Sequence, residues 1–310
     1  MADSDLLTAA FEEHRGRLRA VAYRLLGSMA DADDAVQDTW LRLTGADVSD
    51  VANLGGWLRT VVARVSLNML RSRRYRNEEP VGHAWPGAAE AAASTGAATG
   101  RGAGPAGRAS DPEEEALLAD SVGLALLVVL DTLTPDERLA FVLHDLFATP
   151  FSDVAAVLGR STEAARQLAS RARRRVHGAP SPGRAADLTR QRQVASAFLA
   201  ASRGGDLQAL VALLHPDVIL TADAAAAPSG KPVRLQGVDT VAGGAVASSG
   251  RAGHSDLALI NGAVGIVFAP AGRLRVALAF TVSPTRQVTA IDVIADPDRL
   301  RRLRLAVLPD

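Results

Sequence analysis

The chain of 310 residues contains no cysteine, which excludes disulfide bonds, thiolate metal sites and a cysteine nucleophile. Lys231 is its only lysine, so arginine carries nearly all of the positive charge. No stretch reaches the ~18 apolar residues that a membrane helix needs, and the acidic start Met1–Asp5 lacks the basic region of an export signal. We therefore expect a cytoplasmic protein that does not enter a membrane.

The chain is long enough for about two or three domains, and its composition indicates where they divide. Thirty-four basic and thirty-four acidic residues cancel, so charge must be compared segment by segment. Residues 87–110 are almost wholly Ala, Gly, Ser, Thr and Pro, which is typical of a flexible linker, and residues 177–184 form a shorter Pro- and Gly-rich break. The predicted division is a helical domain at 1–77, a flexible linker at 78–110, a helical domain at 111–177, an α+β domain at 186–300 and a tail at 301–310.

Apolar residues recur at helical spacing three times in the first piece. The spacing predicts helices over about 7–25, 31–43 and 57–76, with Gly27 as the C-terminal cap of the first. The third helix carries six arginines and no acid, so it is locally polycationic despite the neutral total.

The second piece contains a helix-turn-helix signature. Thr134 to Glu137 form a capping box with proline at the first helical position. A short helix over 151–158 is then followed by Gly159, a tight turn and a longer helix from about 161 to 176. The helical spacing predicts that Ala165, Leu168, Ala172 and Val176 of the longer helix are buried. This helix has five arginines and one glutamate, so its charge is about +4.

The third piece begins with helices and continues with strands. Helices are predicted over 191–202 and 206–214, and Asn261-Gly262 between two apolar runs predicts a hairpin over 257–268. Alternating residues predict further strands over 274–282 and 288–294. This order favours a small α+β domain with an antiparallel sheet.

Two basic helices in separate pieces indicate a DNA-binding protein. A helix-turn-helix places its second helix in the major groove, where arginine and glutamine can contact base edges. An isolated basic stripe is more often a solvated face. A second basic helix across a flexible linker instead suggests two DNA segments held at one spacing, with salt-dependent binding through phosphate contacts.

Three segments carry a resemblance to a known family. Residues 11–43 and 56–74 resemble regions 2.1 to 2.4 of the extracytoplasmic-function (ECF) sigma factors of RNA polymerase, and residues 133–176 resemble their region 4. Residues 198–223 resemble the SnoaL-like or NTF2-like cone, which occurs fused to the C-terminus in one sigma-factor subgroup. The expected fold is therefore multidomain, with two all-α domains followed by an α+β cone.

The chain departs from that subgroup in two places. The subgroup's Trp-Leu-Pro-Glu-Pro linker motif is reduced here to Trp85-Pro86, and its Asp-Gly-Gly-Gly motif keeps only Asp223. The near-terminal residues 296–300 (Asp-Pro-Asp-Arg-Leu) resemble its Asn-Pro-Asp-Lys-Leu motif.

The resemblance implies a sigma factor that binds core polymerase and directs promoter-specific initiation, with the cone modulating activity in cis. The implied partners are the clamp helices of the largest polymerase subunit, the beta flap and promoter DNA. The implied polymerase-binding residues are Asp33, Asp34, Gln37, Asp38 and Trp40. The implied contacts to the minus-ten element are Arg64, Ser66, Asn68, Arg71, Arg73 and Arg74. The implied contacts to the minus-thirty-five element are Arg166, Gln167, Ser170, Arg171, Arg173 and Arg174. The implied interdomain regulatory residues are Asp296, Pro297, Asp298, Arg299 and Leu300, and the arginines at 299, 301, 302 and 304 are expected to meet the acids at 113–115.

Two other functions remain open at this stage. One is a helix-turn-helix repressor or activator with a ligand-sensing domain, which needs neither an acidic helix beside Trp40 nor a second basic helix. The other is a small-molecule isomerase or cyclase, for which the candidates Asp223, Asp256, Asp292, His215 and His254 form no evident acid-base pair. We therefore expect no enzyme and no cofactor. We also expect no metal site, because the six histidines show no paired spacing, and the sequence identifies no ligand of the cone.

Overall fold

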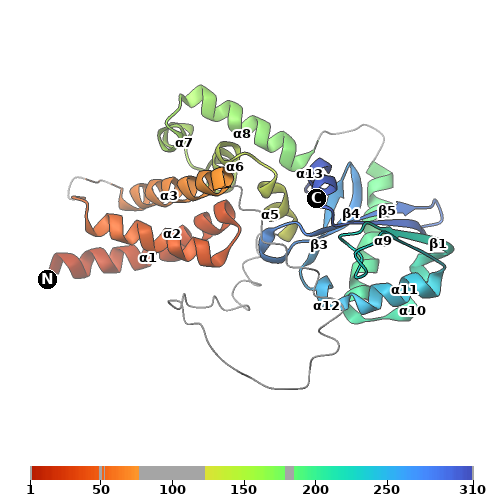
Figure 1. Ribbon diagram of the computed structural model, residues 1–310. Coiled ribbons are helices and arrows are strands. Elements are labelled where there is room, and N and C mark those ends of the chain that lie inside the picture. Colours follow the sequence, from red (N-terminus) through yellow and green to blue (C-terminus); the bar gives the residue numbers. More distant parts are fainter. Residues whose placement is uncertain (1, 49–50, 52, 77–122, 179–184, 309–310) are drawn as a thin grey trace, which may run out of the picture. The chain divides into compact units, whose positions relative to one another are not determined.

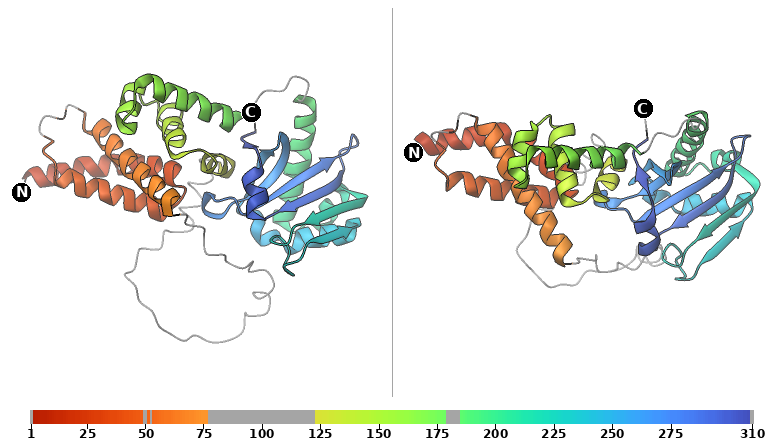
Figure 2. Two further views of the ribbon diagram at one scale, coloured as in Figure 1. Left: turned by 45° about the horizontal axis from the view of Figure 1, so that its top comes forward. Right: turned by 90° about the horizontal axis from the view of Figure 1, so that it is seen from above.

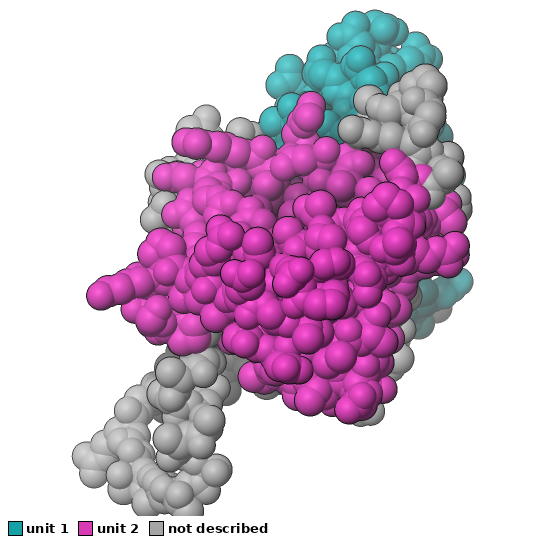
Figure 3. Space-filling model, turned by 90° about the vertical axis from the view of Figure 1, so that its right-hand side faces the viewer, with its two compact units in different colours: residues 1–79, 104–122, 130–175 teal, residues 80–103, 123–129, 176–310 magenta. Residues whose placement is uncertain are grey.

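The computed structural model describes residues 2–48, 51, 53–76, 123–178 and 185–308 (Figure 1). The chain forms two compact units, coloured separately in Figure 3. Unit 1 holds the described residues of 2–76 and 130–175, and unit 2 holds 123–129 and those of 176–308. The predicted linker at 78–110 and the predicted contact acids at 113–115 lie outside the described residues.

Unit 1 begins with three packed helices, α1 (Ala2–Leu26), α2 (Met29–Thr44) and α3 (Leu54–Arg76). The turn between the first two needs a left-handed residue, and Gly27 supplies it with φ 74° while its amide donates to the carbonyl of Tyr23 at 2.7 Å. Ser28 caps α2 by accepting the amide of Asp31. Fully buried Tyr23, Leu25, Met29, Leu43 and Leu58 fill the space between the helices, so the three predicted helices are confirmed.

The second part of unit 1 contains the predicted helix-turn-helix. After α5 (Leu124–Asp131), which begins in unit 2, come α6 (Pro135–Phe141), the short π-helical segment η1 (Val142–Leu146), α7 (Phe151–Leu158) and α8 (Thr162–His177). Both bonds of the predicted capping box between Thr134 and Glu137 are present. Gly159, with φ 65°, ends α7, and Ser161 accepts the amide of Ala164 at the start of α8. The sequence signature of this motif is confirmed.

Unit 2 is built on one sheet with the order β2-β1-β6-β5-β4-β3-β7. Its strands are β1 (Leu214–Ala222), β2 (Val233–Gln236), β3 (Ser255–Ile260), β4 (Ala263–Phe268), β5 (Val276–Val282), β6 (Val288–Ile294) and β7 (Leu305–Ala306). The prediction of a wholly antiparallel sheet is wrong at one pair, because β1 runs parallel to β6. Four strands, β2 to β5, lie between β1 and β6 in the sequence, so the connection is long enough for β6 to run in the same direction as β1.

Helices cover the sheet and enclose the core of unit 2 (Figure 2). They are α9 (Ala185–Gly204), α10 (Leu207–Leu213), α11 (Val238–Ala247) and α12 (Ser249–Ala252), with the short helix α13 (Pro297–Arg302) after β6 and the 3-10 turn η2 (Pro270–Gly272) before β5. Phe198 of α9 and Phe280 of β5 meet edge to face in this core, with ring centroids 5.2 Å apart. The fold class predicted for this part, α+β, is confirmed.

The sheet also extends further along the chain than predicted. The hairpin at Asn261-Gly262 has positive φ at both residues, 53° and 87°, as its sequence requires. The Asn261 side chain then accepts the amide of Arg304 at 3.0 Å, and β7 pairs with β3 directly after it. Residues 301–306 are therefore part of the folded unit, where the sequence predicts a tail.

Candidate nucleic-acid interface

The exposed face of α8 presents one polar stripe. Arg166, Gln167, Ser170 and Arg174 are all exposed, while Ala165, Leu168, Ala172 and Val176 are buried on the opposite side. Arg166 lies 5.7 Å from the ring centroid of Phe151 on α7 and 3.5 Å from Glu163, in an ion pair whose members are both more than half exposed. Such a pair contributes little energy, so Arg166 can exchange Glu163 for a ligand at small cost.

The remaining arginines of α8 lie beside the stripe, and each forms an ion pair with a carboxylate of unit 1. Arg171 and Arg175 approach the carboxylate of Glu137 at 3.5 and 3.0 Å, and Arg173 approaches Asp145 at 2.7 Å. The Glu137 side chain is only 6% exposed, so it ties α8 to α6. Arg171 and Arg173, both predicted to contact DNA, thus have carboxylate partners within the protein.

Two of the residues predicted on α3 are engaged within the three-helix bundle. Ser66 is fully buried, and its hydroxyl has no hydrogen-bond partner among the described residues. The bundle covers it, because Ser66 lies one helical turn after buried Val62 on the same face, so the predicted base contact would require this side chain to become exposed. Arg73 pairs with Asp31 and donates to the carbonyl of Leu26, which joins α3 to α2 rather than leaving a cation for DNA.

The other residues predicted on α3 differ in their surroundings. Asn68 is exposed. Arg64 donates to the carbonyl of Ala156 on α7 at 3.0 Å, and Arg71 donates to the carboxylate of Asp136 on α6 at 2.8 Å. The side chain of Arg74 lies outside the part of the chain that the structure describes.

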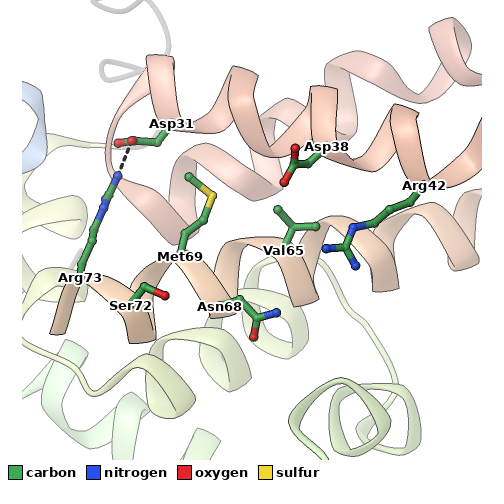
Figure 4. Close-up of a pocket in the computed structure, with 8 residues that line it drawn as sticks. All are labelled: Asp31, Asp38, Arg42, Val65, Asn68, Met69, Ser72 and Arg73. Carbon is green, nitrogen blue, oxygen red and sulfur yellow. Dashed lines mark ion pairs between the residues drawn. The ribbon is translucent and has the colours of Figure 1, made fainter. Parts of the chain in front are cut away.

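A groove of about 360 Å³ runs between α2 and α3 (Figure 4). Val65 and Met69 contribute apolar lining, and polar and charged side chains contribute the rest. These other lining residues are Asp31, Asp38, Arg42, Asn68, Ser72 and Arg73. The groove brings Asp38, predicted for polymerase binding, to the same surface as Asn68, predicted for promoter binding.

The acidic face predicted on α2 is exposed at Asp33, Asp34, Gln37 and Asp38. Asp33 is engaged by Arg19 of α1 at 2.7 Å. Trp40 is half-buried, and its ring centroid lies 5.0 Å from that of Phe11. It therefore packs mainly against the bundle core and leaves only part of its ring for a binding partner.

The exposed apolar residue of this surface is Leu41, at 60% exposure. Sequence reasoning missed it, although its position four residues after Gln37 puts it on the same helical stripe.

In unit 2 the near-terminal motif is bound within its own unit. The carboxylate of Asp223, directly after β1, accepts the amides of Ala295 and Asp296 at 3.0 Å and the guanidinium of Arg299 at 3.2 Å. Arg299 also donates to Asp292 on β6 at 2.7 Å. Arg299, which was expected to meet the acids at 113–115, here anchors α13 to the sheet.

The candidate acids and imidazoles of unit 2 do not converge on one site. Asp223 and Asp292 come together, but through Arg299 and backbone amides. The Asp256 carboxylate accepts the amides of Leu257 and Ala125, and His215 accepts the amide of Asp217. Among the described residues no group of three or more His, Cys, Asp or Glu could hold a metal ion, and none of the described helices is long and apolar enough to cross a membrane.

Two parts of the chain match known protein families. Residues 10–76 match Sigma-70 region 2, and residues 123–176 match Sigma-70, region 4. The ECF RNA polymerase sigma factor SigJ of Mycobacterium tuberculosis is 39% identical over 300 residues, which cover 93% of this chain and 91% of that protein. The probable ECF RNA polymerase sigma factor SigI of the same species is 34% identical over 225 residues, or 72% of each. The crystal structure of the M. tuberculosis extracytoplasmic function sigma factor SigJ is 35% identical and covers 94% of this chain and 97% of its own, with a TM-score of 0.46.

Proposed function

Because the chain belongs to the extracytoplasmic-function (ECF) RNA polymerase sigma factors, we propose that it binds core polymerase through α2 and contacts the two promoter elements through α3 and α8. The observation that carries the proposal is the exposed stripe of α8, formed by Arg166, Gln167, Ser170 and Arg174 on the second helix of a helix-turn-helix. Such a helix fits the major groove, where these side chains reach base edges. We assign no catalytic step to the chain.

The polymerase-binding surface is proposed to be the exposed stripe of α2. Asp34, Gln37 and Asp38 supply acidic and polar groups to a basic partner helix, and Leu41 supplies the apolar contact that the half-buried Trp40 gives only in part. The partner we propose for this stripe is the clamp coiled coil of the largest polymerase subunit, with the beta flap meeting the helix-turn-helix.

On α3, the proposed contacts to the minus-ten element are now Arg64, Asn68 and Arg71. Asn68 is exposed beside the groove in Figure 4 and can donate to or accept from a base. Arg64 and Arg71 must first leave their partners on α7 and α6.

For the C-terminal unit we propose modulation of this activity in cis. In the segment Asp296–Leu300, the amide of Asp296 and the guanidinium of Arg299 donate to Asp223, and a segment ordered by such bonds presents a surface at low entropic cost.

The decisive experiment is run-off transcription with purified core polymerase, with and without this chain, on a promoter library. We expect initiation only when the chain is present, from templates that share two sequence elements. Tight, promoter-specific binding by the free protein without polymerase association would instead support a helix-turn-helix repressor or activator.

Substitution of Arg166 by alanine should change the base preference within the minus-thirty-five element. A bidentate contact from arginine to guanine gives ~1–3 kcal/mol of discrimination, so the preference at one position should fall by roughly 5- to 150-fold. We expect a smaller change for Arg171→Ala, because Arg171 already approaches Glu137. Selection of binding sites by the polymerase holoenzyme, read by sequencing, measures both.

Arg15→Ala is the matched control for Arg166→Ala. Arg15 has the same 58% exposure and also pairs with a glutamate three residues earlier, but it lies on α1. Its loss should leave the selected sequences unchanged. If Arg166→Ala selects the same sequences as this control, α8 does not read the element through Arg166.

A further inference from the structure

Within unit 1 the three-helix bundle is fastened to the helix-turn-helix part by several contacts. Arg71 donates to the Asp136 carboxylate at 2.8 Å, and Arg64 donates to the Ala156 carbonyl at 3.0 Å. Arg138, itself 3% exposed, donates to the carbonyl of Arg24 at 3.2 Å, and the Arg24 guanidinium lies 5.1 Å from the ring centroid of Phe147. The contacts come from α1 and α3 on one side and from α6, α7 and Phe147, which follows η1, on the other, so they hold a defined arrangement.

Asp136 is the charged centre of this contact. Its side chain is 17% exposed and also accepts two bonds from Arg160, at 3.1 and 2.9 Å. Partial burial acts to raise the pKa of the Asp136 carboxyl, but the hydrogen bonds and charges of Arg71 and Arg160 outweigh it and hold the pKa below its ordinary value. The carboxylate is therefore fully charged at neutral pH.

The guanidinium groups of Arg71 and Arg64, which here bind Asp136 and Ala156, are the same groups that are proposed to hold promoter DNA. A guanidinium binds a carboxylate and a phosphate with the same geometry, through parallel N–H groups. While Arg71 lies on Asp136 it cannot hold a DNA phosphate, and while Arg64 lies on the Ala156 carbonyl it cannot reach a base. The same arginines thus face two mutually exclusive partners.

We propose that Asp136 acts as a latch: its carboxylate takes the place of a promoter phosphate on Arg71 and keeps unit 1 closed until DNA and polymerase replace that contact. The inference rests on the proposed function, because it assumes that α3 contacts DNA. A closed state lowers the apparent affinity for DNA by the fraction of molecules that are open. The latch therefore suppresses DNA binding by the free protein.

The test measures opening and DNA binding separately. The chain lacks cysteine, so Glu13→Cys on α1 and Ser152→Cys on α7, both at exposed positions, give a clean dye pair for energy transfer. In this background Asp136→Asn keeps the shape of the side chain and removes its charge. We expect lower energy transfer than in the parent and about three- to tenfold tighter binding of a fluorescent oligothymidylate, which carries phosphates but no promoter sequence.

Asp187→Asn is the control. Asp187 also pairs with an arginine, Arg190, but both residues lie on α9 in unit 2, and neither belongs to a proposed DNA or polymerase contact. It should change neither transfer nor oligothymidylate binding. Equal transfer and equal binding in Asp136→Asn, the control and the parent would overturn the latch.

A second measurement does not depend on the variant's stability. Energy transfer in the parent protein should fall as salt is raised from about 50 to 500 mM, because salt screens the half-exposed Arg71. If Asp136→Asn fails to fold by circular dichroism, a salt-independent transfer in the parent overturns the latch by itself. Run-off transcription is read separately: a variant that opens but does not transcribe supports the latch and contradicts the proposed function.

Discussion

Charge reversal at Asp34 and Asp38 together, to arginine, should weaken binding to core polymerase by at least about 100-fold. Both side chains are exposed on α2, so the fold should tolerate the change. Like charges brought together at an interface cost several kcal/mol, and about 3 kcal/mol already corresponds to roughly 100-fold in affinity. Asp33 is left in place because its ion pair with Arg19 joins α2 to α1. Binding of the labelled chain to immobilised core polymerase measures the effect.

A second double variant, Glu13→Arg with Asp217→Arg, is the matched control. It makes the same change in net charge at exposed positions on α1 and β1, neither of which belongs to the α2 stripe. We expect it to bind polymerase within about twofold of the parent at physiological salt, where distant surface charges are screened. If both double variants lose affinity equally, net charge and not the α2 stripe decides the binding. If both retain it, polymerase binds elsewhere on the chain.

Hydrophobic periodicity was sufficient to predict the helices and the buried faces that matter most for function. The stripe of α8 illustrates this: burial of Ala165, Leu168, Ala172 and Val176 at helical spacing fixes which side faces outward, so Arg166 and Gln167 were assigned correctly to the exposed face. Local chemistry was equally readable in the Thr134 capping box and the Asn261-Gly262 hairpin, because both depend on residues adjacent in the chain.

Burial of single polar residues could not be predicted in the same way. Ser66 shares the buried face of Val62, four residues earlier, but serine is usually an exposed residue, so its residue type favoured the surface. Arg73 reaches Asp31 because arginine is long, and the reach of a side chain is not encoded in helical phase.

Contacts between distant segments left no sequence signal either. Arg71 and Asp136 are 65 positions apart, and Asp223 and Asp296 are 73 apart. Each partner taken alone resembles an ordinary surface charge. The parallel pairing of β1 with β6 belongs to the same class, because strand order depends on the packing of the whole sheet.

Replacement of Phe280 by alanine should selectively destabilise unit 2, by about 3–5 kcal/mol, since it leaves a cavity where a large ring was packed. Phe280 is 8% exposed and meets Phe198 edge to face in the core. Trp40, Trp57 and Trp85 all precede residue 86, so tryptophan fluorescence reports on the N-terminal part, and far-ultraviolet circular dichroism reports on the whole chain. Under urea we expect an earlier transition by circular dichroism and an unchanged one by fluorescence.

Thr281→Ala is the control for Phe280→Ala, because Thr281 is the next residue of β5 and its side chain is exposed. Its unfolding should match that of the parent, which separates loss of the ring from disturbance of the strand. Run-off transcription at a urea concentration that unfolds unit 2 only in Phe280→Ala then tests modulation in cis. We expect a different transcription rate from the control, because an unfolded unit 2 loses the surface that Asp223 and Arg299 hold together. Equal rates would mean that transcription does not depend on the folded C-terminal unit, and the proposed modulation in cis would have to be abandoned.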